Sequence, residues 1–289
     1  MNPANYVIFS EVTCDLPAEY CKKNGIRLLS MTLIVDDKEY TNLDDMPINE
    51  FYRKMREGST TKTAQVTMEH CEQMFTEVLE AGFDVLCLSF SSGLSGSYNV
   101  ARMTAETLSE RYPERKILVV DSLCASMGHG LLLSKAVEKR SEGMPIDELY
   151  KWLLDNRLHL VHLFTVDDLM FLHRGGRVSK TAAIAGSLLG IKPVLHVDDE
   201  GHLVPTGKVR GRKQSLNALV DKMGEQMGSY KNNNFFISHG DCVDDAMYVA
   251  NEIKRRYGIK EYMINYVGTV IGAHSGPGTI ALFFFGEKR

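Results

Sequence analysis

The segment Val85–Ser97, VLCLSFSSGLSGS, decides the fold of this chain. Its first half, Val85–Phe90, is a short apolar run rich in strand-forming residues, which is typical of a strand buried on both faces of a parallel sheet. Serines and a glycine follow, and the sequence from Ser95 onward predicts a helix with Ser95 near its cap. A strand, a Gly/Ser loop and a helix start together present N–H groups and hydroxyls to an anion. The same pattern also describes an ordinary serine-capped connection, so the rest of the chain must decide.

The composition is that of a globular protein with ample core. The chain has 289 residues, of which 44% are hydrophobic and 24% are charged, enough for one large domain or two modest ones. The net charge of -4 argues against nucleic-acid binding, which needs a basic face. No apolar run approaches the ~20 residues that cross a bilayer, and the start, MNPANYVIFS, lacks the features of a signal peptide. We therefore expect a cytoplasmic protein with at most transient membrane contact.

The sequence predicts neither a disulfide framework nor a metal site. The six cysteines are scattered without a C-x-x-C pair, so we expect reduced, mostly buried thiols. The acidic group Asp241, Asp244 and Asp245 is a weak metal candidate, because carboxylates in such a place more often favour a helix N-terminus.

Strands and helices alternate through about residue 155, which predicts a parallel sheet covered on both faces. The expected strands of this part are Tyr6–Ser10, Leu28–Val35, Val85–Phe90 and Lys116–Val120. The second part mixes α/β character with a hairpin of Ile191–Val197 and His202–Val204 around Asp198–Gly201. The expected fold class is α/β with two domains, an N-terminal parallel-sheet α/β domain at residues 1–155 and a C-terminal α+β domain at residues 156–289. A ligand is expected in the cleft between them.

Five segments rich in small, hydroxylic or basic residues are expected to be loops beside strands: Glu11–Asp15, Gly58–Gln65, Ser91–Ser97, His173–Lys180 and Gly268–Thr279. Standard catalytic signatures are missing from them. A nucleophile elbow, G-x-S-x-G, would need glycine where Ser97 stands. Many hydrogen-bond donors without an evident nucleophile and base are typical of a binding site.

Six motifs in a fixed order are more specific than any one loop. They are Thr13-Cys-Asp-Leu-Pro17, Thr63-Ala-Gln65, Ser92-Gly-Leu-Ser-Gly-Ser97, Asp121-Ser122 with Gly128-x-Gly130, Leu172-His-Arg-Gly-Gly-Arg177, and Gly272-Ala-His-Ser-Gly-Pro-Gly278. Together they closely resemble the DegV family of bacterial fatty-acid-binding proteins, over essentially the whole chain. The resemblance implies the DegV fold, with a long-chain fatty acid between and within two α/β domains. It also implies a partner, an ATP-binding kinase subunit that converts the bound carboxylate to an acyl-phosphate. The chain itself would be the lipid-carrying subunit, with no catalysis and no cofactor of its own.

The resemblance also implies the residues of the site. The fatty-acid carboxylate would be bound by Thr63, Ser95, Arg177 and His274. Hydroxyls can fill the lone pairs of a carboxylate taken out of water, and Arg177 and a protonated His274 would offset its charge. His274 is also a candidate for assisting phosphoryl transfer. The supporting loop residues are Ser92, Gly93, Gly96, Ser97, Gly175, Gly176 and Gly276.

The acyl chain is expected among apolar residues of the second part, although such residues are more often plain core. The candidates are Ile184, Leu188, Leu189, Ile191 and Phe283–Phe285. Three positions, Glu11, Val12 and Ala64, depart from the family pattern. Their effect, including any effect on partner contact in the first loop, is left open.

Two alternatives remain at this level. One is a serine-dependent hydrolase or phosphotransferase that uses Ser95 and His274. The other is a lipid sensor that acts without a kinase. The basic run Lys208–Lys213 is either the kinase-contact surface or a solvated loop and helix start. The sequence predicts neither the acyl length and unsaturation nor the oligomeric state.

Overall fold

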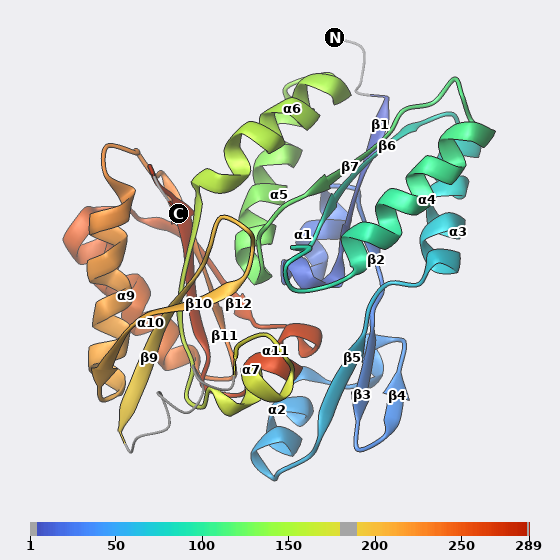
Figure 1. Cartoon of the computed structure of the whole chain (residues 1–289). Helices are drawn as coiled ribbons and strands as arrows, with labels where there is room; N and C mark the ends of the chain where they lie inside the picture. Colours follow the sequence, from blue (N-terminus) through green and yellow to red (C-terminus); the bar gives the residue numbers. More distant parts are fainter. Residues whose placement is uncertain (1–4, 180–189, 288) are drawn as a thin grey trace.

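The computed structural model describes residues 5–179, 190–287 and 289 (Figure 1). The strands are β1 (Tyr6–Glu11), β2 (Ile26–Leu29), β3 (Thr32–Val35), β4 (Lys38–Tyr40), β5 (Thr61–Ala64), β6 (Asp84–Ser89), β7 (Ile117–Asp121), β8 (Leu160–Thr165), β9 (Ile191–Val197), β10 (Leu203–Arg210), β11 (Asn234–His239), β12 (Glu261–Tyr266) and β13 (Ile280–Phe285). The helices are α1 (Ala18–Lys23), α2 (Ile48–Arg56), α3 (Met68–Glu80), α4 (Ser97–Arg111), α5 (Ser126–Ser141), α6 (Ile146–Asn156), α7 (Met170–Arg174), α9 (Arg212–Met227), α10 (Val243–Tyr257) and α11 (Thr269–Ser275).

The first sheet is parallel throughout, in the order β2-β1-β6-β7, as the sequence predicts. Alternate residues of β6 point to opposite faces. Val85 and Cys87 pack with residues of α3 and α4, whereas Leu86 and Leu88 pack with residues of α5. Burial on both faces explains why this strand is a continuous apolar run.

The second sheet has the order β10-β9-β8-β13-β11-β12 and is mostly antiparallel, with β11 and β12 the parallel pair. Helices α9 and α10 cover its outer face, and its inner face is turned toward α5 (Figure 1). The predicted β9–β10 hairpin is confirmed by the pairing of Leu203 with Val197. Its second strand extends to Arg210, well beyond the predicted end at Val204. The mixed α/β class of the chain is therefore as expected.

A third, small sheet of order β4-β3-β5 was missed by the sequence analysis. The predicted strand Leu28–Val35 breaks into β2, which joins the first sheet, and β3, which joins the third (Figure 1). The segment Gly58–Gln65, expected to be a loop, contains β5. This strand escaped detection because none of its four residues, Thr61–Ala64, is fully buried, so it lacks the apolar alternation of a core strand.

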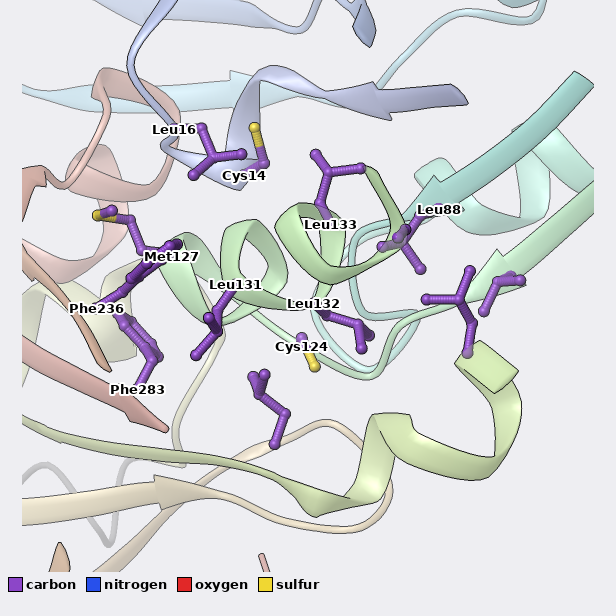
Figure 2. Close-up of a cluster of buried hydrophobic side chains, with 14 of the residues drawn as sticks. Cys14, Leu16, Leu88, Cys124, Met127, Leu131, Leu132, Leu133, Phe236 and Phe283 are labelled. Atoms are coloured by element: carbon purple, nitrogen blue, oxygen red, sulfur yellow. The ribbon is translucent and has the colours of Figure 1, made fainter. Parts of the chain in front are cut away.

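Helix α5 connects the cores of the first and second sheets. Figure 2 shows that Met127 lies beside Phe236 and Phe283 of the second sheet, while Leu133 points toward Cys14 at the end of the first strand. At Gly128 a β-carbon would lie 2.3 Å from His162 Nε2 and 2.7 Å from Phe283 Cδ1, so the close approach of α5 requires glycine there.

Two further observations concern the whole described chain. All six cysteines are free thiols, and five of them are buried. Among the helices of residues 5–179 and 190–287, none is long and apolar enough to cross a bilayer.

Candidate functional site

A cavity of about 210 Å³ opens between the first and second sheets, and all four predicted carboxylate-binding residues line it. They reach it from separate elements. Thr63 lies in β5, Ser95 in the loop before α4, Arg177 in the loop after α7, and His274 in α11. The fold therefore gathers at one place residues that are more than two hundred positions apart in the sequence.

Strand β5 and helix α11 bring Thr63 to His274. The Oγ1 atom of Thr63 lies 2.8 Å from Nε2 of His274. Two residues earlier in β5, Thr61 Oγ1 donates a 2.8 Å hydrogen bond to the carbonyl of Ala273. The segment Gly268–Thr279, predicted to be a loop, instead contains a helix whose glycines allow tight packing: a β-carbon at Gly272 would lie 2.7 Å from the Tyr52 hydroxyl oxygen.

The environment of His274 favours the neutral imidazole at neutral pH. Burial, and then the positive charge of Arg177, lower its pKa to about 4. His274 can therefore offset a ligand's charge at neutral pH only if the bound anion raises this pKa. Its Nδ1 atom is buried and has no hydrogen-bond partner in the described part of the chain. Gly175 makes room for this ring, since a β-carbon there would lie 2.2 Å from Nδ1.

Arg177 holds two loops together and keeps its charge. Its Nε and Nη2 atoms donate to the carbonyl of Leu94 at 3.2 and 3.0 Å, and Nη1 donates to the carbonyl of Gly175. Burial lowers its pKa from the ordinary arginine value, but a guanidinium stays protonated in proteins. In the part of the chain that the structure describes, the hydrogen bonds of Arg177 all go to carbonyl groups and none goes to a carboxylate. A positive charge without a counter-ion among the described residues thus lines the cavity, which favours an anionic ligand.

The serine loop before α4 is tightly folded. The helix begins at Ser97, two residues later than predicted, and Ser95 Oγ accepts a 3.2 Å hydrogen bond from the Ser97 N–H. The Oγ atoms of Ser95 and Ser97 are 3.0 Å apart. Gly96 also lines the cavity, and a β-carbon there would collide with Oε1 of Gln65 at 2.1 Å.

The other predicted supporting residues surround the cavity without lining it. The Ser92 N–H donates to Asp121 Oδ1 at 3.1 Å, and Gly93 packs against the carbonyl of Gly201 in the β9–β10 turn. Gly176 and Gly276 adopt positive φ angles of 75° and 79°, which favour glycine. These residues shape the loops that carry the site.

The apolar wall of the cavity includes the inner face of the second sheet. Phe283 lines it together with Phe164 and Val197. Of the predicted residues Phe283–Phe285, the first alone lines the cavity: Phe284 packs on the outer face with α9 and α10, and Phe285 is core that does not line the cavity. Ile191 does not line it either, whereas Ile184, Leu188 and Leu189 lie outside the described residues.

Sequence reasoning missed several polar lining residues, namely Thr13, Gln65, Ser126, His162, Ser238 and Ser275. Thr13, Gln65 and Ser275 stand inside motifs that the sequence analysis quoted, so their motif membership was the available signal. Ser275 is 5% exposed, and its Oγ has no partner in the described part of the chain. No local pattern marks Ser238, which ends an apolar strand segment.

This fold and cavity define a class: α/β proteins with an internal site between two main sheets, lined by apolar side chains together with a cationic and several hydroxylic ones. The chain belongs to the DegV family, whose model, described as an uncharacterised protein of the DegV family, matches residues 5–287. A DegV domain-containing protein of Clostridium perfringens is 41% identical over 286 residues, 98% of each chain.

Two solved structures share the fold. A DegV family protein of Thermus thermophilus, described as fatty acid binding, is 27% identical with a TM-score of 0.87 and covers 98% of this chain and 99% of its own. A protein of Eubacterium ventriosum, described as binding stearic acid, is 26% identical with a TM-score of 0.89, and the match covers 98% of both chains.

Proposed function

We propose that this chain binds a long-chain fatty acid, with the carboxylate held by Thr63, Ser95, Arg177 and His274 and the acyl chain along the inner face of the second sheet. The observation that carries the proposal is the guanidinium of Arg177, which has no carboxylate partner among the described residues and lines a largely apolar cavity. A carboxylate supplies the missing negative charge, and the hydroxyls of Thr63 and Ser95 supply donors for its lone pairs. Bound carboxylate would also favour protonation of His274.

The acyl chain supplies most of the expected affinity. Each buried methylene contributes about 0.8 kcal/mol, so roughly fourteen of them contribute at most about 11 kcal/mol before the costs of binding. The Thermus and Eubacterium relatives, described as fatty-acid-binding proteins, support the same ligand class for this chain.

The second part of the proposal is that the chain acts in the cytoplasm as a carrier for an ATP-dependent kinase subunit. The partner would use ATP to convert the presented carboxylate into an acyl-phosphate, and the chain itself would perform no catalysis. This step is supported by the family resemblance of the six motifs.

The hydrolase alternative receives no support from the site. A serine nucleophile needs a hydrogen bond to its base. In the described structure Ser95 Oγ forms its hydrogen bonds with Ser97, and the Nε2 atom of His274 forms its hydrogen bond with Thr63. The arrangement therefore fits binding better than nucleophilic attack.

Native mass spectrometry of the purified protein, followed by solvent extraction, tests the ligand. A stoichiometric fatty acid is expected. A protein that carries no fatty acid and does not bind added fatty acid would refute the proposal.

The combined Thr63→Ala and Ser95→Ala variant tests whether the site presents the carboxylate to the kinase, because it should abolish acyl-phosphate formation by the ATP-binding subunit. Ser92→Ala is the control. Ser92 is exposed, and its bond to Asp121 is made by the backbone N–H, which the substitution keeps. Normal fatty-acid binding without acyl-phosphate formation by the wild type would favour the lipid sensor.

A further inference from the structure

A second polar group lines the same cavity, on the wall assigned to the acyl chain. Ser126 opens α5 and Ser238 lies in β11; both line the cavity, and their Oγ atoms are 2.8 Å apart. Ser238 is in register with Ala281 of β13, another lining residue. The proposed carboxylate-binding end is built from β5, α11 and the loops before α4 and after α7. The two polar groups therefore come from different elements.

Burial raises the pKa of Asp15 to about 7, so the hydrogen bonds in this group take one direction above that pH, where Asp15 is ionised. Ser126 Oγ donates its proton to Asp15 Oδ2 at 2.5 Å, and Asp15 also accepts from the Gly268 N–H. Since a hydroxyl has one proton, the 2.8 Å contact requires Ser238 to donate to Ser126. The lone pairs of Ser238 Oγ then have no donor within the described residues. Ser238 thus offers the cavity a hydrogen-bond acceptor.

Thr13 is a second buried hydroxyl residue that lines the cavity. Thr13 lies two residues before Asp15 and lines the cavity. Its side chain is 1% exposed, and its Oγ1 atom has no hydrogen-bond partner in the described part of the chain. A buried hydroxyl that makes no hydrogen bond is costly, and such groups are uncommon in folded proteins. Thr13 can offer the cavity a donor.

We propose that the preferred ligand is a fatty acid with a hydroxyl group on its chain, held by Ser238 and Thr13. This proposal rests on the proposed function and specifies its substrate. A chain hydroxyl donates one hydrogen bond, to Ser238 Oγ, and accepts one from the Thr13 hydroxyl. An oxo group can accept from Thr13 but cannot donate to Ser238. An unsubstituted acyl chain forms a hydrogen bond with neither Ser238 nor Thr13.

The test compares octadecanoic acid with monohydroxylated octadecanoic acids whose hydroxyl moves carbon by carbon along the chain. Affinities are measured by displacement of a fluorescent fatty acid at about pH 8.5, where Asp15 is ionised. In an apolar tunnel every chain hydroxyl lowers affinity, on the order of ten-fold or more. We expect one position, or two adjacent positions, to bind at least as tightly as octadecanoic acid, and the oxo acid of that position to bind more weakly than the hydroxy acid.

Two variants assign the effect to the side chains. Ser238→Ala removes the acceptor and leaves the Ser126–Asp15 bond in place, and Thr13→Val removes the donor at nearly constant shape. Each should lower the affinity for the favoured hydroxy acid about ten-fold relative to octadecanoic acid. Ser215→Ala is the matched control, because it removes a buried serine hydroxyl from α9, which does not line the cavity.

The outcomes separate this proposal from the function on which it rests. If octadecanoic acid and every hydroxy acid fail to bind, the fatty-acid function itself fails. If octadecanoic acid binds but every hydroxyl position weakens binding, the polar wall does not recognise the ligand and this proposal is overturned. An unchanged preference in both Ser238→Ala and Thr13→Val overturns it as well.

Discussion

The Oγ1 atom of Thr63 lies 2.8 Å from Nε2 of His274, although the two residues are 211 positions apart in the sequence. This contact joins the small third sheet to helix α11 at the cationic end of the cavity. It therefore makes a direct test of the proposed carboxylate site possible.

Thr63→Val should weaken fatty-acid binding roughly ten-fold. The variant keeps the shape of the side chain and removes the hydroxyl that bonds to His274 and is assigned to the carboxylate. Displacement of a fluorescent fatty acid measures the change, with Ser92→Ala as the control. An affinity equal to that of the wild type would remove Thr63 from the proposed site.

Gly175→Ala and Gly176→Ala should have different effects. Gly175 has a φ angle of -73°, which alanine tolerates, but its β-carbon would lie 2.2 Å from His274 Nδ1. The imidazole must move away from Thr63, and we expect fatty-acid binding and acyl-phosphate formation to fall. Gly176 has a φ angle of 75° with no atom within 4 Å of a β-carbon, so its variant should lose only about 1 kcal/mol of stability.

Binding assays and urea unfolding of the two glycine variants separate these effects. If both variants bind the fatty acid equally well, the position of the His274 ring has no influence on the ligand. In that case the role assigned to His274 is wrong.

Arg177→Lys and Arg177→Gln should separate charge from geometry. The guanidinium bonds to the carbonyls of Leu94 and Gly175 at once, which an ammonium group cannot reproduce in full. We expect both variants to lose about 1 to 2 kcal/mol of unfolding free energy. Arg177→Lys should retain more fatty-acid affinity than Arg177→Gln, because it keeps the positive charge. Equal affinities would show that the charge does not contribute to binding.

Glu11→Gln should change how stability depends on pH. Glu11 is fully buried, and burial raises its pKa from 4.5 to about 7 despite hydrogen bonds from Ser89 and the Phe90 N–H. Between these values the folded chain holds a proton that the unfolded chain has lost. Glu11 therefore lowers the free energy of unfolding as pH rises through this window, by roughly 3 kcal/mol in all.

The difference between Glu11→Gln and the wild type should accordingly be small near pH 4.5 and should favour the variant by roughly 3 kcal/mol at about pH 8. Burial lowers the pKa of His129 and His162. These residues destabilise the folded state as pH falls, but the comparison at equal pH cancels their effect. Urea unfolding measures the difference, with the exposed Glu50→Gln as control. A difference independent of pH would contradict the raised pKa.

Local patterns sufficed where structure is determined by neighbours in the sequence. The apolar run of β6, the turn residues of the β9–β10 hairpin and the alternation of strands and helices predicted the parallel sheet and the mixed second sheet correctly. The ordered motifs identified the family. They also named Thr63, Ser95, Arg177 and His274, which the fold brings to one cavity.

Tertiary structure decided what depends on distant partners. The split of Leu28–Val35 between two sheets follows from strand pairing. Phe284 lies on the outer face of β13, and of the two residues in the inner core only Phe283 lines the cavity. The neutrality of His274 and the raised pKa of Glu11 both arise from burial, which no local pattern reports. The sequence by itself determined most strands of the first and second sheets, the family and the chemical groups of the candidate site. Only the packing of segments far apart in the chain set the positions, charges and hydrogen-bond partners of those groups.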